Sequence, residues 1–185
     1  SVTLTLAAYG NVPCSDATST MVLTIVPAAI ADAGLADDVC EGSTYTLGGT
    51  SASNYSAIGW TSSGTGTFNP TNTLTPIYTP SAADILAGSV TLTLTAYGNV
   101  PCSDVTSTMV LTIVPAAIAD AGLADDICEG STYTLGGTSA SNYSAIDWTS
   151  SGTGTWTNVT SLTPIYDPSA ADILAGSVTL TLTAY

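Results

Sequence analysis

The chain has 185 residues, a length that allows one large or two small domains with a buried core. It contains no Lys, Arg or His, and its 14 Asp and Glu residues give a formal charge of -14. Because cations are needed to neutralise phosphates, this composition excludes nucleic-acid binding and argues against an anionic membrane surface as a partner. Without His or Lys, triad and Schiff-base chemistry is absent, so we expect no enzyme activity.

The balance of apolar and charged residues predicts a folded chain. Hydrophobic residues make up 45% of the sequence and charged residues 8%, which is unlike the composition of disordered proteins. No apolar run approaches the roughly 18 residues of a membrane span, so we expect no membrane insertion. The sequence from Ser1 to Leu6 already alternates as a strand, and residues 181–185 end within one. We therefore expect the chain to be a segment of a longer repetitive protein.

An internal repeat with a period of 88 residues organises the chain. Residues 1–97 align with 89–185 without a gap, and 86 of the 97 positions are identical. A closing strand is expected at 110–114, because Pro115 cannot continue a central strand, and Pro27 takes the same place one period earlier. The predicted domains are thus the last strands of a preceding module (1–26), a complete module (27–114) and a module lacking its last strand (115–185).

Within the complete module the pattern is that of β-structure. Short strands are expected at 46–47 and 58–60, separated by Gly-rich turn signals. Ser81 and Asp84 have the spacing of a capping box, and Gly88 can end the helical turn that follows. Residues 89–97 alternate apolar and hydroxyl side chains with a period of two, as in a strand with one buried face. Roughly seven short strands per module predict an all-β protein of tandem Ig-like β-sandwich modules.

Several blocks of the module carry a family resemblance. They are Ala33-Gly34 and the segments 39–43, 60–68, 78–85 and 88–94. Together these blocks resemble the Ig-like or PKD-like repeats of very long cell-surface adhesins of Bacteroidota, among them gliding-motility adhesins, many of which are exported by type IX secretion. The resemblance implies a structural, non-catalytic repeat of an extracellular adhesin stalk or surface filament, with neighbouring identical repeats as its partners.

Two other functions remain open at this stage. The modules could form a self-assembling extracellular filament or sheath through lateral or strand-exchange contacts between copies, because Thr-rich edges lack Lys residues that would block pairing. Alternatively, the module could bind surface glycans through Trp156 and the variable segment 68–73. Packing is the simpler role for Phe68 and Trp156. We also expect Trp60 and Trp148 to lie in the cores, where Ig-like sandwiches place an indole.

Four cysteines recur two per period, as expected of an extracellular protein. The favoured pairing joins Cys40 to Cys102 within the module and leaves Cys14 and Cys128 to pair with cysteines beyond residues 1–185. The alternative joins Cys14 to Cys40 and Cys102 to Cys128 across module junctions, and a third possibility is free thiols. The in-module pairing requires Cys102, in an expected hairpin loop, to lie close to Cys40, which precedes a strand.

Acidic residues gather near each module junction. The candidate calcium ligands are Asp37, Asp38, Glu41, Asp125, Asp126 and Glu129. Carboxylate oxygens are the ligands that Ca²⁺ prefers, and a bound ion would stiffen the junction. The spacing of an EF-hand loop is absent, and a solvated acidic loop is the alternative.

Overall fold

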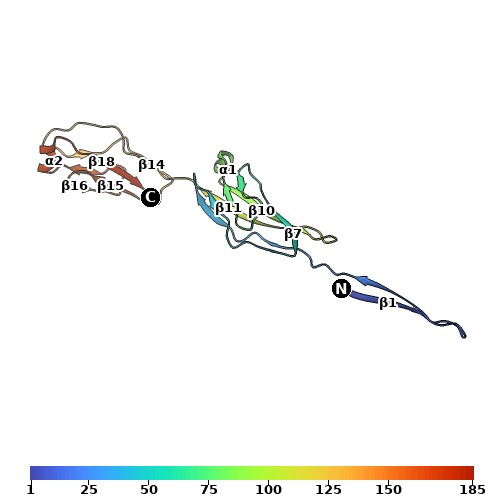
Figure 1. Ribbon diagram of the computed structural model, residues 1–185. Helices are drawn as coiled ribbons and strands as arrows, with labels where there is room; N and C mark the ends of the chain where they lie inside the picture. Colours follow the sequence, from blue (N-terminus) through green and yellow to red (C-terminus); the bar gives the residue numbers. More distant parts are fainter. The chain divides into compact units, whose positions relative to one another are not determined.

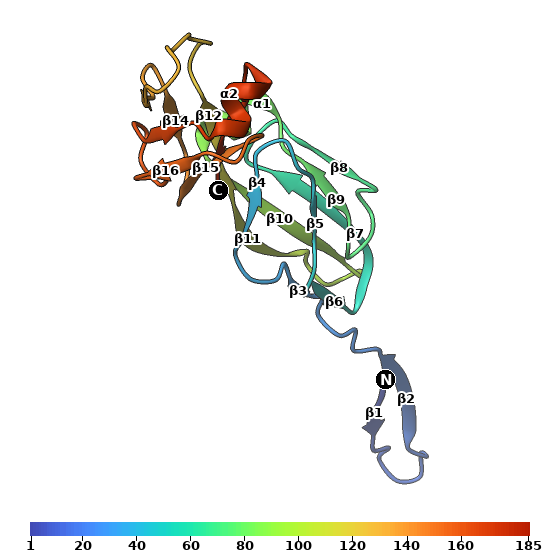
Figure 2. The same cartoon turned by 90° about the vertical axis from the view of Figure 1, so that its left-hand side faces the viewer.

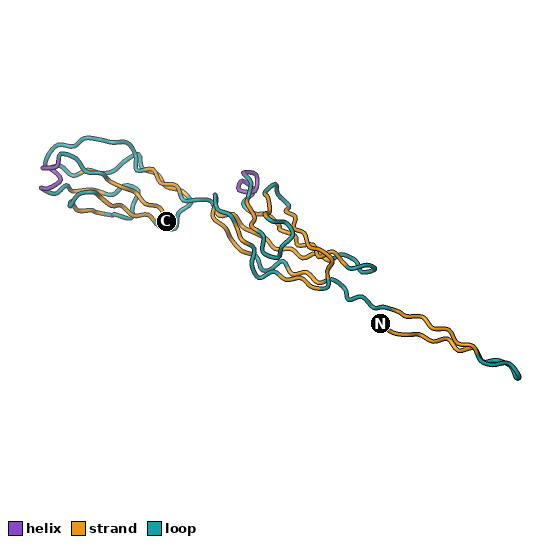
Figure 3. Tube along the Cα trace, viewed as in Figure 1, coloured by secondary structure: helices purple, strands orange, loops and turns teal.

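The computed structural model describes residues 1–185 and divides into two compact units, Ser1–Val114 and Pro115–Tyr185. Strands dominate both units, and the two helices are short (Figures 1 and 3). The first unit runs across Pro27, and the three segments predicted from the prolines stay a prediction. Neither helix is long and apolar enough to cross a membrane.

The first unit opens with a hairpin of β1 (Val2–Ala8) and β2 (Ala17–Leu23), which pair antiparallel from Val2 opposite Leu23 to Ala8 opposite Ala17. The remaining elements of the unit are β3 (Ile30–Asp32), β4 (Asp37–Cys40), β5 (Tyr45–Thr46), β6 (Ser51–Ser53), β7 (Tyr55–Ser62), β8 (Thr67–Asn69), β9 (Ile77–Thr79), α1 (Ala82–Ala87), β10 (Ser89–Gly98) and β11 (Val105–Val114).

The module that follows the hairpin is a sandwich of a four-stranded and a three-stranded sheet with an additional two-stranded pair, and its strands are labelled in Figure 2. The larger sheet has the order β4-β11-β10-β7, in which β4 runs parallel to β11 and the other pairs are antiparallel. The smaller sheet has the order β5-β9-β8, and β3 pairs with β6. The core lies between the sheets. Leu94 and Leu111 of the larger sheet pack there in one cluster with Tyr78 of β9 and with Leu47, which follows β5. These observations establish the all-β, Ig-like sandwich.

The expected helical turn is formed. Ser81 caps α1 through a capping box with Asp84, and Gly88 adopts a left-handed conformation with φ of 75° after its last residue. The alternation of 89–97 forms the predicted strand with one buried face. Val90, Leu92, Leu94 and Ala96 are buried, whereas Ser89 and Tyr97 are exposed.

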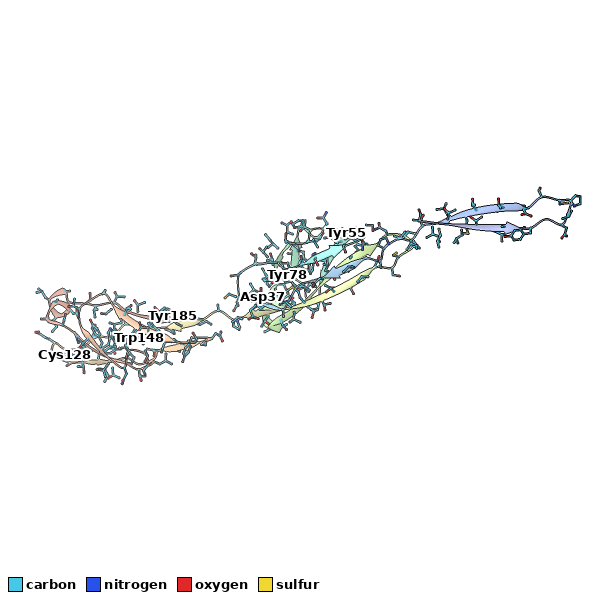
Figure 4. All side chains as sticks on the ribbon, turned by 90° about the horizontal axis from the view of Figure 1, so that it is seen from below. Asp37, Tyr55, Tyr78, Cys128, Trp148 and Tyr185 are labelled. Atoms are coloured by element: carbon cyan, nitrogen blue, oxygen red, sulfur yellow. The ribbon has the colours of Figure 1, made fainter.

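The second unit repeats this plan with fewer paired strands. Its elements are β12 (Ile118–Asp120), β13 (Tyr133–Thr134), β14 (Ser139–Ser141), β15 (Ile146–Ser150), β16 (Thr155–Thr157), β17 (Ile165–Asp167), α2 (Ala170–Ala175) and β18 (Leu180–Ala184). The sheets are β13-β17-β16, β12-β14 and β15-β18. Its core is built around Trp148, Leu135 and Tyr166. Trp148 lies inside this unit and Tyr78 inside the first (Figure 4), and Trp60 is also buried.

Candidate functional site

A buried carboxylate joins three elements of the complete module. Asp84, in the first turn of α1, is 1% exposed and is the one buried charged side chain of its unit. Its Oδ1 accepts a hydrogen bond from the Thr65 amide at 2.9 Å. Its Oδ2 accepts hydrogen bonds from the Gly66 amide at 2.9 Å, the Ser81 amide at 2.9 Å and the Tyr78 hydroxyl at 2.8 Å. The carboxylate therefore fixes the β7–β8 loop and β9 to the start of α1.

The loop reaches the carboxylate because it carries glycine at two positions. A Cβ on Gly64 would overlap with Asp84 Oδ1, and a Cβ on Gly66 would lie 2.6 Å from Asp84 Oδ2 and from the Thr79 carbonyl oxygen. Only a residue without a side chain permits such an approach of the backbone. The Gly64-Thr65-Gly66 sequence is thus a requirement of the buried carboxylate as well as a turn signal.

The second unit repeats the arrangement with one change. Asp172 accepts hydrogen bonds from the Thr153 amide at 2.9 Å, the Ser169 amide at 3.0 Å and the Tyr166 hydroxyl at 2.7 Å. The Gly154 amide donates to the Tyr166 hydroxyl oxygen instead of to the carboxylate. The same acid, tyrosine and serine therefore form the network in both units.

These hydrogen bonds keep both carboxylates ionised. Burial on its own raises the pKa of Asp84, but hydrogen bonds from the Ser81 and Thr65 amides and the Tyr78 hydroxyl outweigh it and lower the pKa to about 2. The Thr153 amide is the main cause for Asp172, followed by the Tyr166 hydroxyl, and the pKa of that carboxyl is also lowered to about 2. Burial and the neighbouring carboxylate in turn raise the pKa of Tyr78.

Acid should remove this stabilisation over a defined range. The pKa of Asp84 is lower in the folded chain than its ordinary value of 3.8, so its contribution is complete above about pH 4 and is lost as the pH falls towards 2. Thermal melts at steps from pH 7 to pH 2 should show this loss. The double variant Asp84→Asn/Asp172→Asn should start from a lower stability and lose less of it over the same range. A parallel decline of both proteins would contradict this assignment.

The chain enters and leaves the complete module at opposite ends of β11. At the entry, the Cys102 sulfur lies 3.3 Å from the Val26 carbonyl oxygen, and the Asn54 side chain donates to the Ala28 carbonyl oxygen at 3.1 Å. At the exit, Val114 is registered with Cys40 of the parallel strand β4, and its carbonyl oxygen accepts from the Glu41 amide at 2.8 Å. Ten residues of β11 separate the two ends, or about 30 Å of strand.

This topology corrects the cysteine prediction. All four cysteines are free, and Cys40 and Cys102 lie at opposite ends of β11. A disulfide requires Cα atoms within about 7 Å, so the Cys40–Cys102 bond within one module is wrong. The structure also forms neither of the alternative bonds, which would involve Cys14 and Cys128.

The acidic residues near the junction form no ready-made metal site. Asp37 accepts hydrogen bonds from the Asp38 amide at 2.9 Å and from the Tyr45 hydroxyl at 3.0 Å, and Asp125 accepts from the Asp126 amide at 2.9 Å. Burial, with the contribution of Asp37, raises the pKa of Tyr45 to about 12. The structure contains no group of three or more Cys, Asp or Glu side chains that could hold a metal ion. Calcium binding at Asp37, Asp38, Glu41 and their counterparts stays a prediction without a preformed set of ligands.

The variable segment packs around the core tryptophans. Phe68 lies 5.9 Å from Trp60 and 4.8 Å from Tyr78 between ring centroids, and Trp156 lies 5.9 Å from Trp148 and 4.7 Å from Tyr166. The Trp60 indole donates to the Thr73 carbonyl oxygen at 3.0 Å. Phe68 and Trp156 therefore fill the same aromatic position in the two units, which supports packing over a glycan-stacking role.

Comparisons with known proteins find a distant structural likeness that carries no argument about this chain. No family model matches the chain, and no curated protein matches it. Among solved structures, a crystal structure of protocadherin gamma C5 EC1-3 is similar over 98% of this chain and 75% of that one, with 11% identity and a TM-score of 0.41. A likeness of this extent supports no statement about what the chain binds or does.

Proposed function

We propose that the chain is a structural segment of an extracellular adhesin stalk or surface filament, in which each module adds length and resists extension. The observation that carries this proposal is the entry and exit of the chain at opposite ends of β11, with only residues 115–117 between β11 and β12. A module joined in this way transmits a pull along its strands. The adhesin setting, the cell-surface location and the export route rest on the family resemblance of the repeat.

The strand order suits a pull between the two ends. Force applied at Pro27 and Val114 would slide β11 along β4, where four residue pairs from Leu111–Asp37 to Val114–Cys40 are in register. The hydrogen bonds of a parallel ladder are evenly spaced along the paired strands, so sliding loads them together instead of one after another. The Asp84 network holds the opposite sheet to α1 while this load is applied.

The near-identity of the modules favours a structural role over catalysis. Residues 1–97 and 89–185 differ at only 11 positions, and the carboxylate network recurs in both units. Identical copies in tandem present the same surface at each period, as a uniform stalk requires. The chain also lacks Lys, Arg and His, which removes the usual bases and nucleophile activators.

Single-molecule stretching tests the proposal. With handles at residues 27 and 114, the module should unfold in one event with a length gain on the order of 250 Å, the extended length of its 88 residues less its folded length. Handles at 40 and 114, adjacent at one end, should peel β4 from β11 at a clearly lower force. Equal forces in the two geometries, or gradual extension without an event, would remove the mechanical basis of the proposal.

A further inference from the structure

The loop between β10 and β11 holds a cysteine against the chain that enters the complete module. This loop, residues 98–104, is closed by a hydrogen bond from the Gly98 amide to Asp104 Oδ1 at 2.9 Å. Its Cys102 Sγ lies 3.3 Å from the carbonyl oxygen of Val26, the residue that precedes the module. The thiol is therefore fixed at the entry of the module, next to one particular backbone atom.

The exit of the same module presents its other cysteine beside the equivalent backbone atom. Val114 is the counterpart of Val26 one period later, and it is registered with Cys40 in the parallel ladder of β11 and β4. The Val114 carbonyl oxygen accepts a hydrogen bond at 2.8 Å from the amide of Glu41, the residue after Cys40. Val39 is buried and Cys40 is exposed, so the Cys40 thiol lies on the outer face of the sheet.

The repeat brings these two contacts to one atom. Residues 17–26 and 105–114 differ only at the first position, so in a continued array each copy of this valine ends one module and precedes the next. Its carbonyl oxygen then accepts from the residue after one cysteine and contacts the thiol of the other. A disulfide joins Cα atoms up to about 7 Å apart, so cysteines that share one neighbouring oxygen in this way are within its reach.

We propose that disulfides link successive modules of the array, each joining Cys40 of one module to the counterpart of Cys102 in the next. As the S–S bond forms, the two thiols give up two electrons and two protons, which reduce a small-molecule disulfide such as oxidised glutathione to two thiols. The partners are 150 positions apart, which is the 62 positions from Cys40 to Cys102 and one period of 88. No two of the four cysteines in residues 1–185 have this separation, which agrees with their being free.

These bonds would leave the array almost without slack. Cys102 would be bonded at the entry of one module and Cys128 at the exit of the next, so residues 102–128 become the shortest covalent path across two modules. The 26 residue steps of this path extend to about 85 Å at about 3.3 Å each, close to the length of two modules of about 35 to 45 Å. A pull on the oxidised array therefore loads a nearly straight covalent line and does not unfold the modules.

A chain extended along the repeat tests the pairing. Appending a second copy of residues 98–114 after Tyr185 continues the period and supplies the counterpart of Cys102 that Cys40 should meet. The other three cysteines are replaced by Ser, so only this pair of thiols remains. After incubation with oxidised glutathione, a non-reducing gel should show a monomer that migrates faster than the reduced chain, and alkylation should find both thiols lost.

Two control chains show whether the position of the thiols matters. One keeps Cys40 and Cys102 as its only cysteines, a pair that lies at opposite ends of β11. The other combines Cys40→Ser with Asp38→Cys, which moves the thiol two residues back along β4 to the position registered with Thr112. The first control should form at least tenfold less closed monomer than the test chain, and the second several-fold less. Absence of the closed monomer, dimers in its place, or equal closure in the first control overturns the proposal.

Stretching the same extended chain measures the mechanical effect of the bond. With handles at residue 27 and at the appended end, the reduced chain should unfold in two events, one for each module. The oxidised chain should lose both events, because the bond bypasses most of the two modules, and unchanged events would overturn the inextensible link. This inference goes beyond the structural role proposed above. A reduced chain that extends without an event contradicts that role, whereas the gel reads the bond alone.

Discussion

Replacing Asp84 by Ala should destabilise the first unit by about 3 kcal/mol, because four donors lose their shared acceptor inside the module. The Thr65, Gly66 and Ser81 amides and the Tyr78 hydroxyl cannot all find water without opening the loop. Trp60, the one tryptophan of the first unit, reports its unfolding in urea. The second unit carries its tryptophans at Trp148 and Trp156, so both are changed to Phe in the parent and the variant.

Asp104→Ala is the matched control for this measurement. It removes the same charge from an exposed side chain that accepts one hydrogen bond, from the Gly98 amide at 2.9 Å. We expect it to cost less than about 1 kcal/mol, as for other exposed polar contacts. If the two variants lowered the free energy of unfolding equally, the hydrogen bonds to Asp84 would stabilise the module no more than an exposed polar contact does.

Gly66→Ala should be nearly as disruptive, with a loss of about 2 to 3 kcal/mol in the free energy of unfolding. The added methyl group would lie 2.6 Å from both Asp84 Oδ2 and the Thr79 carbonyl oxygen, and it would overlap the Tyr78 hydroxyl. Backbone and core atoms surround the position, so no flexible side chain can move aside. Urea unfolding followed through Trp60 measures this variant too.

Gly48→Ala distinguishes this steric effect from a general effect of removing glycine. Gly48 has no atom within 4 Å of an added Cβ, and its φ is not in the left-handed region. The substitution should therefore leave stability unchanged or raise it by a few tenths of a kcal/mol, through the unfolded chain. A loss comparable with that of Gly66→Ala would show that the space around the carboxylate is not the cause.

The local features of the fold were predictable from the sequence because each depends on neighbouring residues. The alternation of 89–97 indicated a strand with one buried face, and Ser81, Asp84 and Gly88 indicated a capped helical turn. The module boundaries at Pro27 and Pro115, which rest on the missing amide of proline, stay predictions.

Only part of the carboxylate network could be predicted from the sequence. The capping box explained Asp84 as a local partner of Ser81, but its other donors come from a loop nearly 20 residues earlier and from β9. The two glycines of Gly64-Thr65-Gly66, recurring with the same distance to an Asp in the second module, were the available signal. The need for glycine at these two positions follows only from the fold, in which the β7–β8 loop lies against Asp84 of α1.

The cysteine and calcium predictions depended on which residues meet in space. Recurrence of two cysteines per period suggested a bond within the module, but Cys40 and Cys102 lie at opposite ends of β11. Asp37 and Asp38 are adjacent in sequence, but both belong to β4, where successive side chains point to opposite faces of a sheet. Closeness along the chain therefore did not bring these carboxylates together.

Electron microscopy of the native material tests most directly whether the modules serve to add length. The account predicts a thread one module wide with an axial step of about 35 to 45 Å, set by strands of nine or ten residues at about 3.3 Å each. A thick fibre with several modules in each cross-section, or particles with no axial repeat, would contradict the account.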